Sequence, residues 1–431
     1  MEGFLNTVQT LGRSMMRLPT PVLLGSIMLI VGLFLRMSFT KALRAALQIA
    51  VGFVMIQQMV RLLTSNMFPA MEAVVKRTGL QLDILDVGAH AVGIASLGTD
   101  IGLVIIPLGV AVNLVMLALR LTRSVNTDLG ALWQTAFGGT VVALMTGSAT
   151  AGFATSIVLI AGMLVLADRS QKTLSELGNM PGASFPLCTA VGQYYYAVVM
   201  SRIYDRVLPF LKNRRLETHQ LKERLGIYGE PVTVGLIIGA LVAVLAGYDF
   251  FGLANLSITI AAILYVYPYF AKTLQDGLRM VAQSGTEYFQ ERFAGRQLYV
   301  GVNWYSLLRP EALEIGLLLM PITLLLAAIL PGITVLPLTD LAYLFTVVTI
   351  ITVVAEGDLV RSFVLGLVSV VIGLYISQWY TPYTTEIVSR FGQGLPEGTT
   401  RVTALWVGWE YFVSAVVLVI RGLQNLVGLV L

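Results

Sequence analysis

The stretch Tyr228-Gly229-Glu230-Pro231-Val232-Thr233-Val234-Gly235 lies near the middle of a chain of 431 residues. A basic and polar segment from Arg202 to Arg224 precedes it, and a long apolar run, Val232–Ala246, follows it. Proline suits the first turn of a helix, because its missing N–H would be unpaired there anyway. The stretch therefore predicts a membrane helix that begins at Pro231. Glu230 at its entrance is either an ordinary interfacial carboxylate or part of a functional site.

The composition is that of a protein embedded in a lipid bilayer. Hydrophobic residues make up 56% of the chain and charged residues only 12%, with a mean hydropathy of +0.81. A soluble domain has about 25% charged residues. Several apolar runs are shorter than the roughly 20 residues of a straight span, and such segments are typical of the broken helices of transporters. The sequence predicts an all-α polytopic membrane protein.

Other classes of function find little support in the sequence. The net charge of +4 is assigned to cytoplasmic loops rather than to nucleic-acid binding. Cys188 is the only cysteine, which excludes an internal disulfide and a cysteine metal cluster, and two histidines are too few for a histidine metal site. No G-x-x-x-x-G-K-[ST] loop occurs, so ATP-driven transport would need another subunit. We expect no metal, no cofactor and no nucleic-acid partner.

Short motifs recur in the same order in the two halves of the chain. Pro21-Val22-Leu23-Leu24-Gly25 matches Pro231-Val232-Thr233-Val234-Gly235, 210 residues later. Thr127-Asp128-Leu129 matches Thr339-Asp340-Leu341, 212 residues later. The shared order and the nearly constant offset predict two transmembrane repeats, residues 1–215 and 216–431.

The distribution of charge predicts that the repeats have opposite orientations. The turn after the first span carries Arg36, Lys41 and Arg44, whereas its counterpart after Ala246 carries no base. Because basic loops stay in the cytoplasm, the matching loops are expected on opposite sides of the membrane. Each repeat then needs an odd number of spans, most simply five. Inverted repeats place a substrate site near the bilayer midplane where the halves meet, which favours a transporter.

Several segments depart from simple spans. Leu82–Ser96 and Leu298–Leu308 mix polar with apolar residues and are expected to be broken segments, and Gly178–Ser201 has the composition of a re-entrant hairpin. Irregular backbone is tolerated inside a membrane only where it lines protein or a watery cavity. Met67–Arg77 is expected to form a short interfacial helix and Ala271–Phe293 an amphipathic cytoplasmic helix.

Six polar side chains are predicted to bind a transported ligand. A charge at bilayer depth costs roughly 3 kcal/mol on insertion scales, so such groups are functional candidates. The predicted binding residues are Glu230, Asp86, Gln48, Gln134, Asn303 and His90. Amides, one or two carboxylates and nearby aromatic rings suit a polyhydroxylated ligand. Gln48 is either a ligand or a link between helices, and Asp86 or Glu230 could instead couple transport to protons or sodium.

At these residues the sequence resembles the galactitol-type enzyme IIC of the bacterial phosphotransferase system, within a superfamily that includes ascorbate carriers. The resemblance is in register over about residues 40–420, and its strongest motif is Gly229-Glu230-Pro231. The other motifs that carry it include Leu85-Asp86-Val87-Gly88, Arg120–Asp128, Thr146-Gly147-Ser148, Leu245–Asp249 and Val335–Ala342.

This resemblance implies a multi-pass protein of the bacterial inner membrane. It implies a homodimer in which each protomer has a scaffold part and a mobile transport part. It also implies uptake of a sugar alcohol that a cytoplasmic IIB partner phosphorylates from a phosphocysteine, with a IIA partner recharging IIB. The chain itself would carry no phosphorylated residue.

The sequence departs from the family pattern at several polar positions. Gln48 and Gln134 stand where the family has histidines, and Leu187 stands where it has the histidine of I-P-H-G. Asn303 replaces the aspartate of G-L-D, and Arg309 begins the pair that replaces G-H. Glutamine can still form hydrogen bonds, but an asparagine cannot act as a base toward a substrate hydroxyl. The substrate differs from galactitol, or phosphoryl transfer is handled elsewhere, or the chain transports without phosphorylation.

Three functions are therefore weighed. The first is a permease that moves a polyol such as galactitol by an elevator-type mechanism, with phosphorylation by IIB. The second is a secondary transporter of the same fold, ion-coupled or uncoupled, that does not phosphorylate its substrate. The third is a membrane protein that senses a substrate or binds a partner without transport. Uptake of a polyol with and without a phosphorylated IIB partner separates the first two, and binding without uptake would indicate the third.

Overall fold

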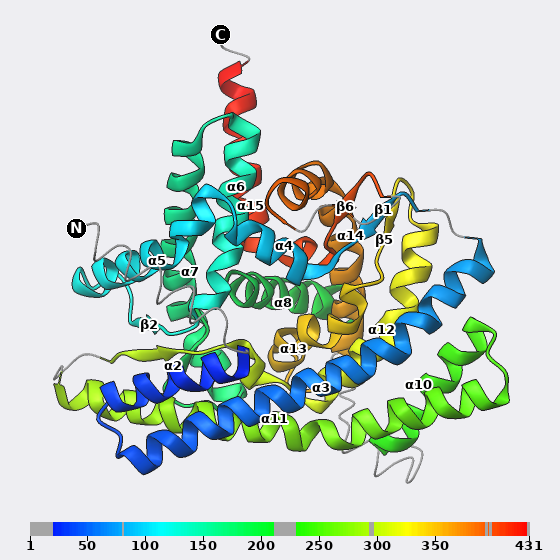
Figure 1. The fold of residues 1–431 in the computed structure, drawn as a ribbon, viewed down its shortest axis with the longest axis horizontal. Coiled ribbons are helices and arrows are strands. Elements are labelled where there is room, and N and C mark those ends of the chain that lie inside the picture. The colour runs from blue at the N-terminus through cyan, green and yellow to red at the C-terminus, as the bar shows by residue number, and fades with distance from the viewer. Residues whose placement is uncertain are drawn as a thin grey trace.

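The structure, a computed structural model, describes residues 20–79, 82–210, 230–292, 297–392, 395 and 399–428. Helices dominate it (Figure 1), and seven of the described helices are long and apolar enough to cross a membrane. The chain is thus an all-α polytopic membrane protein, as predicted. Residues 1–19 and 211–229, which include much of the basic linker, lie outside the described residues.

The central helix begins where the sequence predicts. Helix α10, Pro231–Ala246, has Glu230 at its N-cap position and proline in its first turn. It ends at Gly247, whose φ of +76° is a left-handed conformation that glycine adopts without strain. The N–H of Gly247 returns to the carbonyl groups of Ala243 and Val244, which satisfies the last turn.

Four helices form a layer along one side of the molecule. Helices α2 (Thr20–Phe34), α3 (Phe39–Thr78), α10 and α11 (Phe250–Arg292) form this layer, in which α3 packs against the other three. In Figure 1, α11 lies along the lower edge and α3 rises obliquely beside it from the lower left. Their backbones approach closely at Gly52, where an added Cβ would lie 2.6 Å from the backbone nitrogen of Leu274. Any larger residue there would separate the two helices.

Two boundaries predicted from the sequence are wrong. Met67–Arg77 is not a separate helix but belongs to the last part of α3, and the described part of Ala271–Phe293, up to Arg292, continues the preceding span as α11. Pro69 and Pro268 lie inside these helices without ending them. At 1.5 Å per residue, the 40 residues of α3 extend about 60 Å, roughly twice the hydrocarbon thickness of a bilayer.

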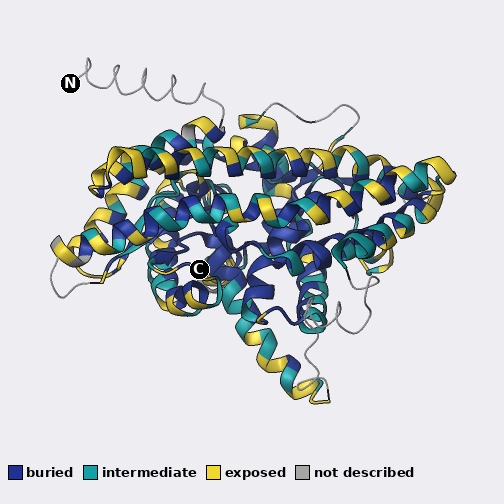
Figure 2. Ribbon diagram, turned by 90° about the horizontal axis from the view of Figure 1, so that it is seen from below, coloured by how far each residue is buried: buried dark blue, intermediate teal, exposed yellow. Residues whose placement is uncertain are grey.

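The remaining helices of both halves pack on the other side of α3. They are α4 (Gly88–Leu97), α5 (Asp100–Ala118), α6 (Trp133–Thr146), α7 (Ala149–Leu177), α8 (Cys188–Val207), α12 (Pro310–Ile329), α13 (Leu344–Val354), α14 (Leu359–Phe391) and α15 (Tyr411–Gly428). Buried aromatic pairs join the two halves, as where Phe137 of α6 meets Tyr380 of α14 edge to face at 5.2 Å. Figure 2 shows buried residues gathered inside and exposed ones along the outer faces of the helices.

The described residues include six short strands, which lie among these helices and form two parallel sheets. In one sheet β1 (Ile84–Asp86) lies between β5 (Val335–Leu336) and β6 (Val402–Thr403). In the other, β4 (Tyr299–Gly301) lies between β2 (Ser124–Asn126) and β3 (Ala183–Ser184). The strands were not predicted, but β1 and β4 fall in the two segments expected to be broken.

The two sheets interlock the halves of the chain. Each central strand comes from one half, and both of its neighbours come from the other. Matching hydrogen bonds support the exchange, because Thr339 Oγ1 donates to the carbonyl of Asp86 and Thr127 Oγ1 donates to the carbonyl of Gly301, both at 2.6 Å. The two halves therefore fold around each other instead of forming separate units.

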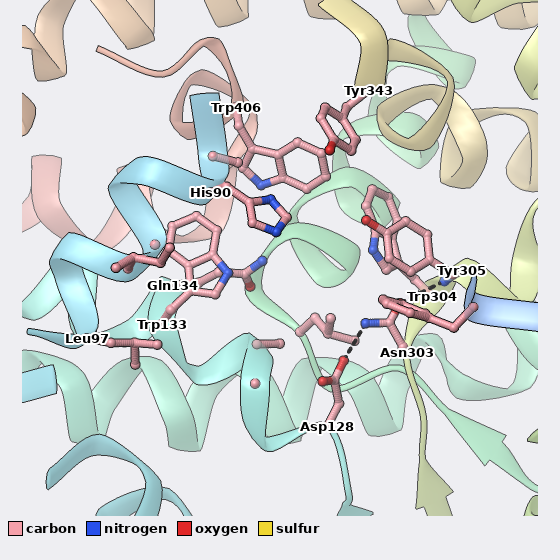
Figure 3. Close-up of a pocket in the computed structure, with 17 residues that line it drawn as sticks. His90, Leu97, Asp128, Trp133, Gln134, Asn303, Trp304, Tyr305, Tyr343 and Trp406 are labelled. Carbon is pink, nitrogen blue, oxygen red and sulfur yellow. Dashed lines mark hydrogen bonds between the residues drawn. The ribbon is translucent and has the colours of Figure 1, made fainter. Parts of the chain in front are cut away.

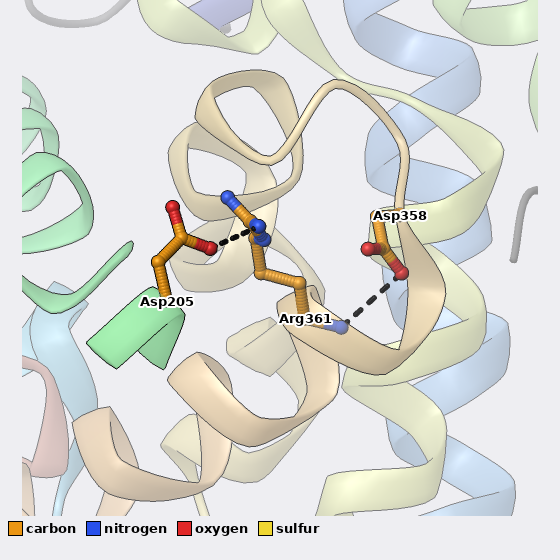
Figure 4. Close-up of polar contacts among 3 residues, drawn as sticks. All are labelled: Asp205, Asp358 and Arg361. Carbon is orange, nitrogen blue, oxygen red and sulfur yellow. Dashed lines mark hydrogen bonds and ion pairs between the residues drawn. The ribbon is translucent and has the colours of Figure 1, made fainter. Parts of the chain in front are cut away.

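An ion pair adds a further link between the halves (Figure 4). Arg361, in the first turn of α14, contacts Asp205 near the end of α8 at 2.6 Å. The carboxylate of Asp358 accepts hydrogen bonds from the backbone N–H groups of Val360 and Arg361 and so caps α14. The guanidinium group of Arg361 also lies 5.1 Å from the centre of the Tyr204 ring. Segment 178–201, expected to be a hairpin, contains β3 and most of α8.

Candidate ligand-binding cavity

A cavity of about 300 Å³ lies where the two sheets end (Figure 3). Every strand is followed within seven residues by a residue that lines it: His90 after β1, Asp128 after β2, Leu187 after β3, Asn303 after β4, Tyr343 after β5 and Trp406 after β6. Ligands of parallel sheets commonly bind beyond the carboxyl ends of the strands. The interlocked strands therefore bring residues from distant parts of the chain to one site.

Asp128 and Asn303 form the central polar pair of the cavity. The Asn303 side-chain amide donates to Asp128 Oδ2 at 2.6 Å. Asn303 Oδ1 accepts from the N–H of Tyr305 at 2.9 Å, which fixes the amide orientation, and Asn126 Oδ1 accepts from the N–H of Asp128 at 3.0 Å. Both side chains are partly exposed. The pair presents a carboxylate held in place by a neutral donor, which suits the binding of hydroxyl groups.

Aromatic rings form much of the cavity wall. Trp304 stacks on Tyr305 with ring centroids 6.1 Å apart, and it meets Trp406 edge to face at 5.9 Å. Trp133 lies against Gly93 of α4, where an added Cβ would come within 3.3 Å of the indole. Apolar walls with a few placed polar groups are typical of small-molecule sites. This combination suits a ligand with a carbon chain and several hydroxyl groups.

Gln134 belongs to a buried network behind the wall. Its Nε2 donates to Thr189 Oγ1 at 2.6 Å, and its Oε1 accepts from the N–H of Thr189 at 3.3 Å. Thr189 in turn donates to Glu410 Oε1, which also accepts from Trp406 Nε1 at 3.0 Å. Two lining residues, Gln134 and Trp406, are therefore held by one fully buried carboxylate.

Asp86 lies behind the cavity and holds backbone groups. It is fully buried, and its carboxylate accepts hydrogen bonds from the N–H groups of Gly88, Asp340 and Leu405 at 2.9, 2.8 and 3.2 Å. Gly88 has a φ of +82°, and a Cβ there would lie 2.6 Å from Thr339 Cγ2. This junction determines where α4 begins and thereby positions His90.

The structure brings three of the six predicted binding residues together. His90, Gln134 and Asn303 line the cavity, whereas Asp86 lies behind it. Gln48 and Glu230 lie elsewhere. Gln48 lies on α3, and its Oε1 is a buried oxygen with no hydrogen-bond partner among the described residues. Glu230 lies at the N-terminus of α10, partly exposed. Their roles in binding stay predictions.

Sequence reasoning did not assign Asp128 or most of the aromatic wall to the site. Asp128 was noticed only within two motifs, the repeated Thr127-Asp128-Leu129 and the family motif Arg120–Asp128, and not as a binding residue. Its counterpart, Asp340, lies outside the cavity lining. The motif thus gives no signal that separates the two aspartates, and the aromatic residues look like ordinary membrane-protein residues in an apolar chain.

A multi-spanning membrane protein with an aromatic cavity that also has polar side chains, set between interlocked halves, fits the class of small-molecule permeases. The chain belongs to the EIIC-GAT family, described as the PTS system sugar-specific permease component, whose family model matches residues 15–398. The resemblance inferred from the motifs is thereby confirmed. The protein is accordingly a multi-pass protein of the bacterial inner membrane.

Two relatives from Escherichia coli K12 illustrate the similarity. One, named "Putative permease IIC component", is 34% identical over 383 residues, which cover 89% of this chain and 87% of the relative. The other, the PTS system galactitol-specific EIIC component, is 29% identical over 381 residues, which cover 88% of this chain and 84% of the relative. EIIC components work with IIA and IIB partners on sugar or polyol substrates in a membrane.

Proposed function

We propose that the chain is the IIC subunit that carries a polyol such as galactitol, with phosphorylation by a separate IIB partner. The observation that carries this proposal is the Asp128–Asn303 pair set among Trp133, Trp304 and Trp406. A carboxylate and amides bind hydroxyl groups, and aromatic faces pack against the carbon chain. Galactitol is the substrate in the name of one relative.

Within this proposal the ligand contacts are His90, Asp128, Gln134 and Asn303. Asp86 acts as a positioning residue, because its hydrogen bonds fix the start of α4. Glu230 and Gln48 are proposed to contribute in another conformation of the transport cycle. Glu230→Gln is then expected to abolish substrate binding, and unchanged affinity of this variant for a labelled polyol would remove Glu230 from the site.

An inverted-repeat, elevator-type mechanism is also part of the proposal. The exchange of strands between halves, with the same order of elements in each, supports two related repeats. The cavity adjoins α3, since Phe53 lines it and meets Tyr305 edge to face at 6.4 Å. Helices α2, α3, α10 and α11 would be the scaffold of a homodimer, and the sheets with their helices would move. Cysteines placed in 271–293 should resist labelling from outside intact cells.

Asp128 is the proposed acceptor of the hydroxyl proton in phosphoryl transfer. Asn303 cannot take a proton at neutral pH, whereas a carboxylate in hydrogen-bond reach of a substrate hydroxyl can. The hydroxyl oxygen would form the new P–O bond, the P–S bond of the phosphocysteine on IIB would break, and the proton would pass to Asp128. The product would be a polyol phosphate and a thiolate on IIB.

The test is uptake of labelled polyols into vesicles with and without a phosphorylated IIB partner, followed by analysis of the internal product. Phosphorylated product that appears only with IIB supports the proposal. Free polyol that accumulates equally without IIB contradicts the phosphorylation step. Asp128→Asn, which keeps the shape of the side chain, should bind less polyol and form no product.

An ion-coupled transporter is the second candidate, and Glu410 is the observation that favours it. This carboxylate is fully buried, and its Oε2 has no hydrogen-bond partner among the described residues. It contacts Trp406 of the cavity wall and reaches Gln134 through Thr189. Under this reading a proton gradient alone would drive polyol uptake, and Glu410→Gln would abolish that dependence while polyol binding persists.

A further inference from the structure

A second cavity of about 240 Å³ adjoins the first. The two share four lining residues, Phe53, His90, Tyr305 and Tyr343, which therefore stand between them. The second cavity also contains Gln57, Arg61 and Thr346 in its lining. A ligand that passes the shared residues would occupy both cavities.

The two cavities differ in charge. Among the described residues, the lining of the first contains the carboxylate of Asp128 and neither lysine nor arginine. The lining of the second contains Arg61 and, again within the described part of the chain, no carboxylate. Arg61 forms no ion pair with an acidic residue in the part of the chain that the structure describes. A guanidinium group without a carboxylate partner is suited to a ligand that carries its own negative charge.

One face of α3 connects the cavities. Phe53, Gln57 and Arg61 are spaced four residues apart, so they lie above one another on the same face of the helix. The eight steps along the chain from Phe53 to Arg61 correspond to a rise of about 12 Å along the helix axis. An extended six-carbon polyol with a charged group at one end has comparable length. Arg61 also lies in a helix long and apolar enough to span the membrane, where a charged side chain is a functional candidate.

We infer that the second cavity is a subsite for the anionic end of a polyhydroxylated ligand whose hydroxyl chain lies in the first cavity. The anionic group is a phosphate ester or a carboxylate. A phosphate ester would be the product of the proposed function, on which this assignment rests, and a carboxylate would belong to a sugar acid taken up as substrate. In either case Arg61 provides the charge and Gln57 a further hydrogen bond.

The test measures equilibrium binding to the full-length protein in lipid nanodiscs. The three probes are galactitol, galactitol 1-phosphate and galactonate. Arg61→Gln should weaken binding of the preferred anion about tenfold or more, since a charge-assisted hydrogen bond contributes about 1.5–3 kcal/mol. Binding of galactitol should change less than about twofold, because one hydrogen bond fewer to a neutral hydroxyl is worth little. Arg61→Lys should retain most of the anion affinity.

Arg44→Gln is the matched control, because Arg44 is exposed on the same helix and lines neither cavity. It should leave binding of all three probes unchanged. Preference for the ester over galactonate assigns the subsite to the product, and the reverse preference assigns it to an acidic substrate. Equal binding of both anions by Arg61→Gln and the wild type would overturn the inference and make Arg61 a residue that extends to lipid head groups.

The binding results separate a wrong assignment of the anionic subsite from a wrong assignment of the transported polyol. A wild-type protein that binds galactitol but neither anion contradicts the subsite and leaves the polyol permease standing. A wild-type protein that binds galactonate in an Arg61-dependent way, but not galactitol, supports the subsite and contradicts a neutral polyol substrate. Loss of all binding in Arg61→Gln, including galactitol, would overturn the separation of the two subsites.

Discussion

The motif Thr-Asp-Leu occurs at 127–129 and 339–341, and its two copies use the aspartate differently. In both copies the threonine hydroxyl donates to a strand carbonyl of the opposite half. Asp340 then accepts from the backbone N–H groups of Ala89 and Trp406, at 2.9 and 2.8 Å. Asp128 meets the side-chain amide of Asn303. One aspartate holds the fold together, and the other is available to a ligand.

The difference follows from what surrounds each carboxylate. A second buried carboxylate, Asp86, lies near Asp340. The backbone N–H groups that donate hydrogen bonds to these two carboxylates come from three chain segments, which are thereby held together. Buried charges are stable only when such donors satisfy them. Near Asp128 the donors are the side-chain amide of Asn303 and the backbone N–H of Ala131, and the other surroundings include the aromatic walls of a cavity. Of these two related aspartates, one therefore belongs to the buried framework and the other lines a cavity.

The largest expected effect breaks the buried junction. Asp86→Ala removes the acceptor of three backbone N–H groups and should destabilise the protein by about 4 kcal/mol, since each unsatisfied buried donor costs about 1–3 kcal/mol. The midpoint of thermal unfolding in detergent measures it. Asp128→Ala is the control and should shift the midpoint much less. Equal shifts of the unfolding midpoint in the two variants would show that Asp86 and Asp128 contribute equally to stability, against the distinction drawn here.

The next largest effect concerns ligand binding at the Asp128–Asn303 pair in the cavity. Asp128→Asn should weaken polyol binding about 30-fold, equivalent to about 2 kcal/mol for a hydrogen bond to a charged acceptor. The exchange Asp128→Asn with Asn303→Asp restores an amide–carboxylate pair with the charge moved to residue 303. If this double variant recovers wild-type affinity in equilibrium binding, the pair matters and the position of the carboxylate does not, against the role given to Asp128.

A smaller effect is expected from the wall beside Asp128. Trp304→Ala should weaken polyol binding about tenfold, because an aromatic contact contributes about 1 kcal/mol beyond the area that it buries. Trp304→Tyr should recover most of the affinity, since it keeps an aromatic face. A similar loss in both variants would mean that the wall acts through the packing of Trp406, which Trp304 meets edge to face.

The smallest effect should come from a link outside both junctions. Arg361→Gln removes the ion pair with Asp205; the Arg361 side chain is 16% exposed and that of Asp205 is 29% exposed. The loss should lower the free energy of unfolding by about 1 kcal/mol, the upper end of the range for such pairs. The unfolding midpoint measures this too, and binding should not change. A loss of stability as large as that of Asp86→Ala would contradict the claim that Asp86 and its hydrogen bonds contribute more to stability than this ion pair does.

Sequence reasoning predicted the spans better than the site. Helix α10 begins at Pro231 as expected, and β1 and β4 lie in the two segments predicted to be irregular. The predicted breaks near Met67 and Ala271 are wrong, because packing of α3 against α11 keeps both helices continuous past their prolines. His90, Gln134 and Asn303, which line the cavity, were selected from the sequence because polar groups in an apolar chain stand out. Asp128 was not selected, because its motif also occurs at Asp340, which does not line the cavity.

The sequence by itself determined that the chain crosses a membrane, that its halves repeat a common order of motifs, and that a few polar side chains must find partners. These properties depend on composition and on the order of neighbouring residues, because the length of an apolar run decides whether it can span the hydrocarbon core of a bilayer. The tertiary structure alone decided which partners they found. Asp86 and Leu405 are 319 residues apart, and Asp128 and Asn303 are 175 apart, yet each pair shares a hydrogen bond. Only the exchange of strands between the halves brings such distant residues within reach and separates the aspartate that holds the fold from the one that faces the cavity.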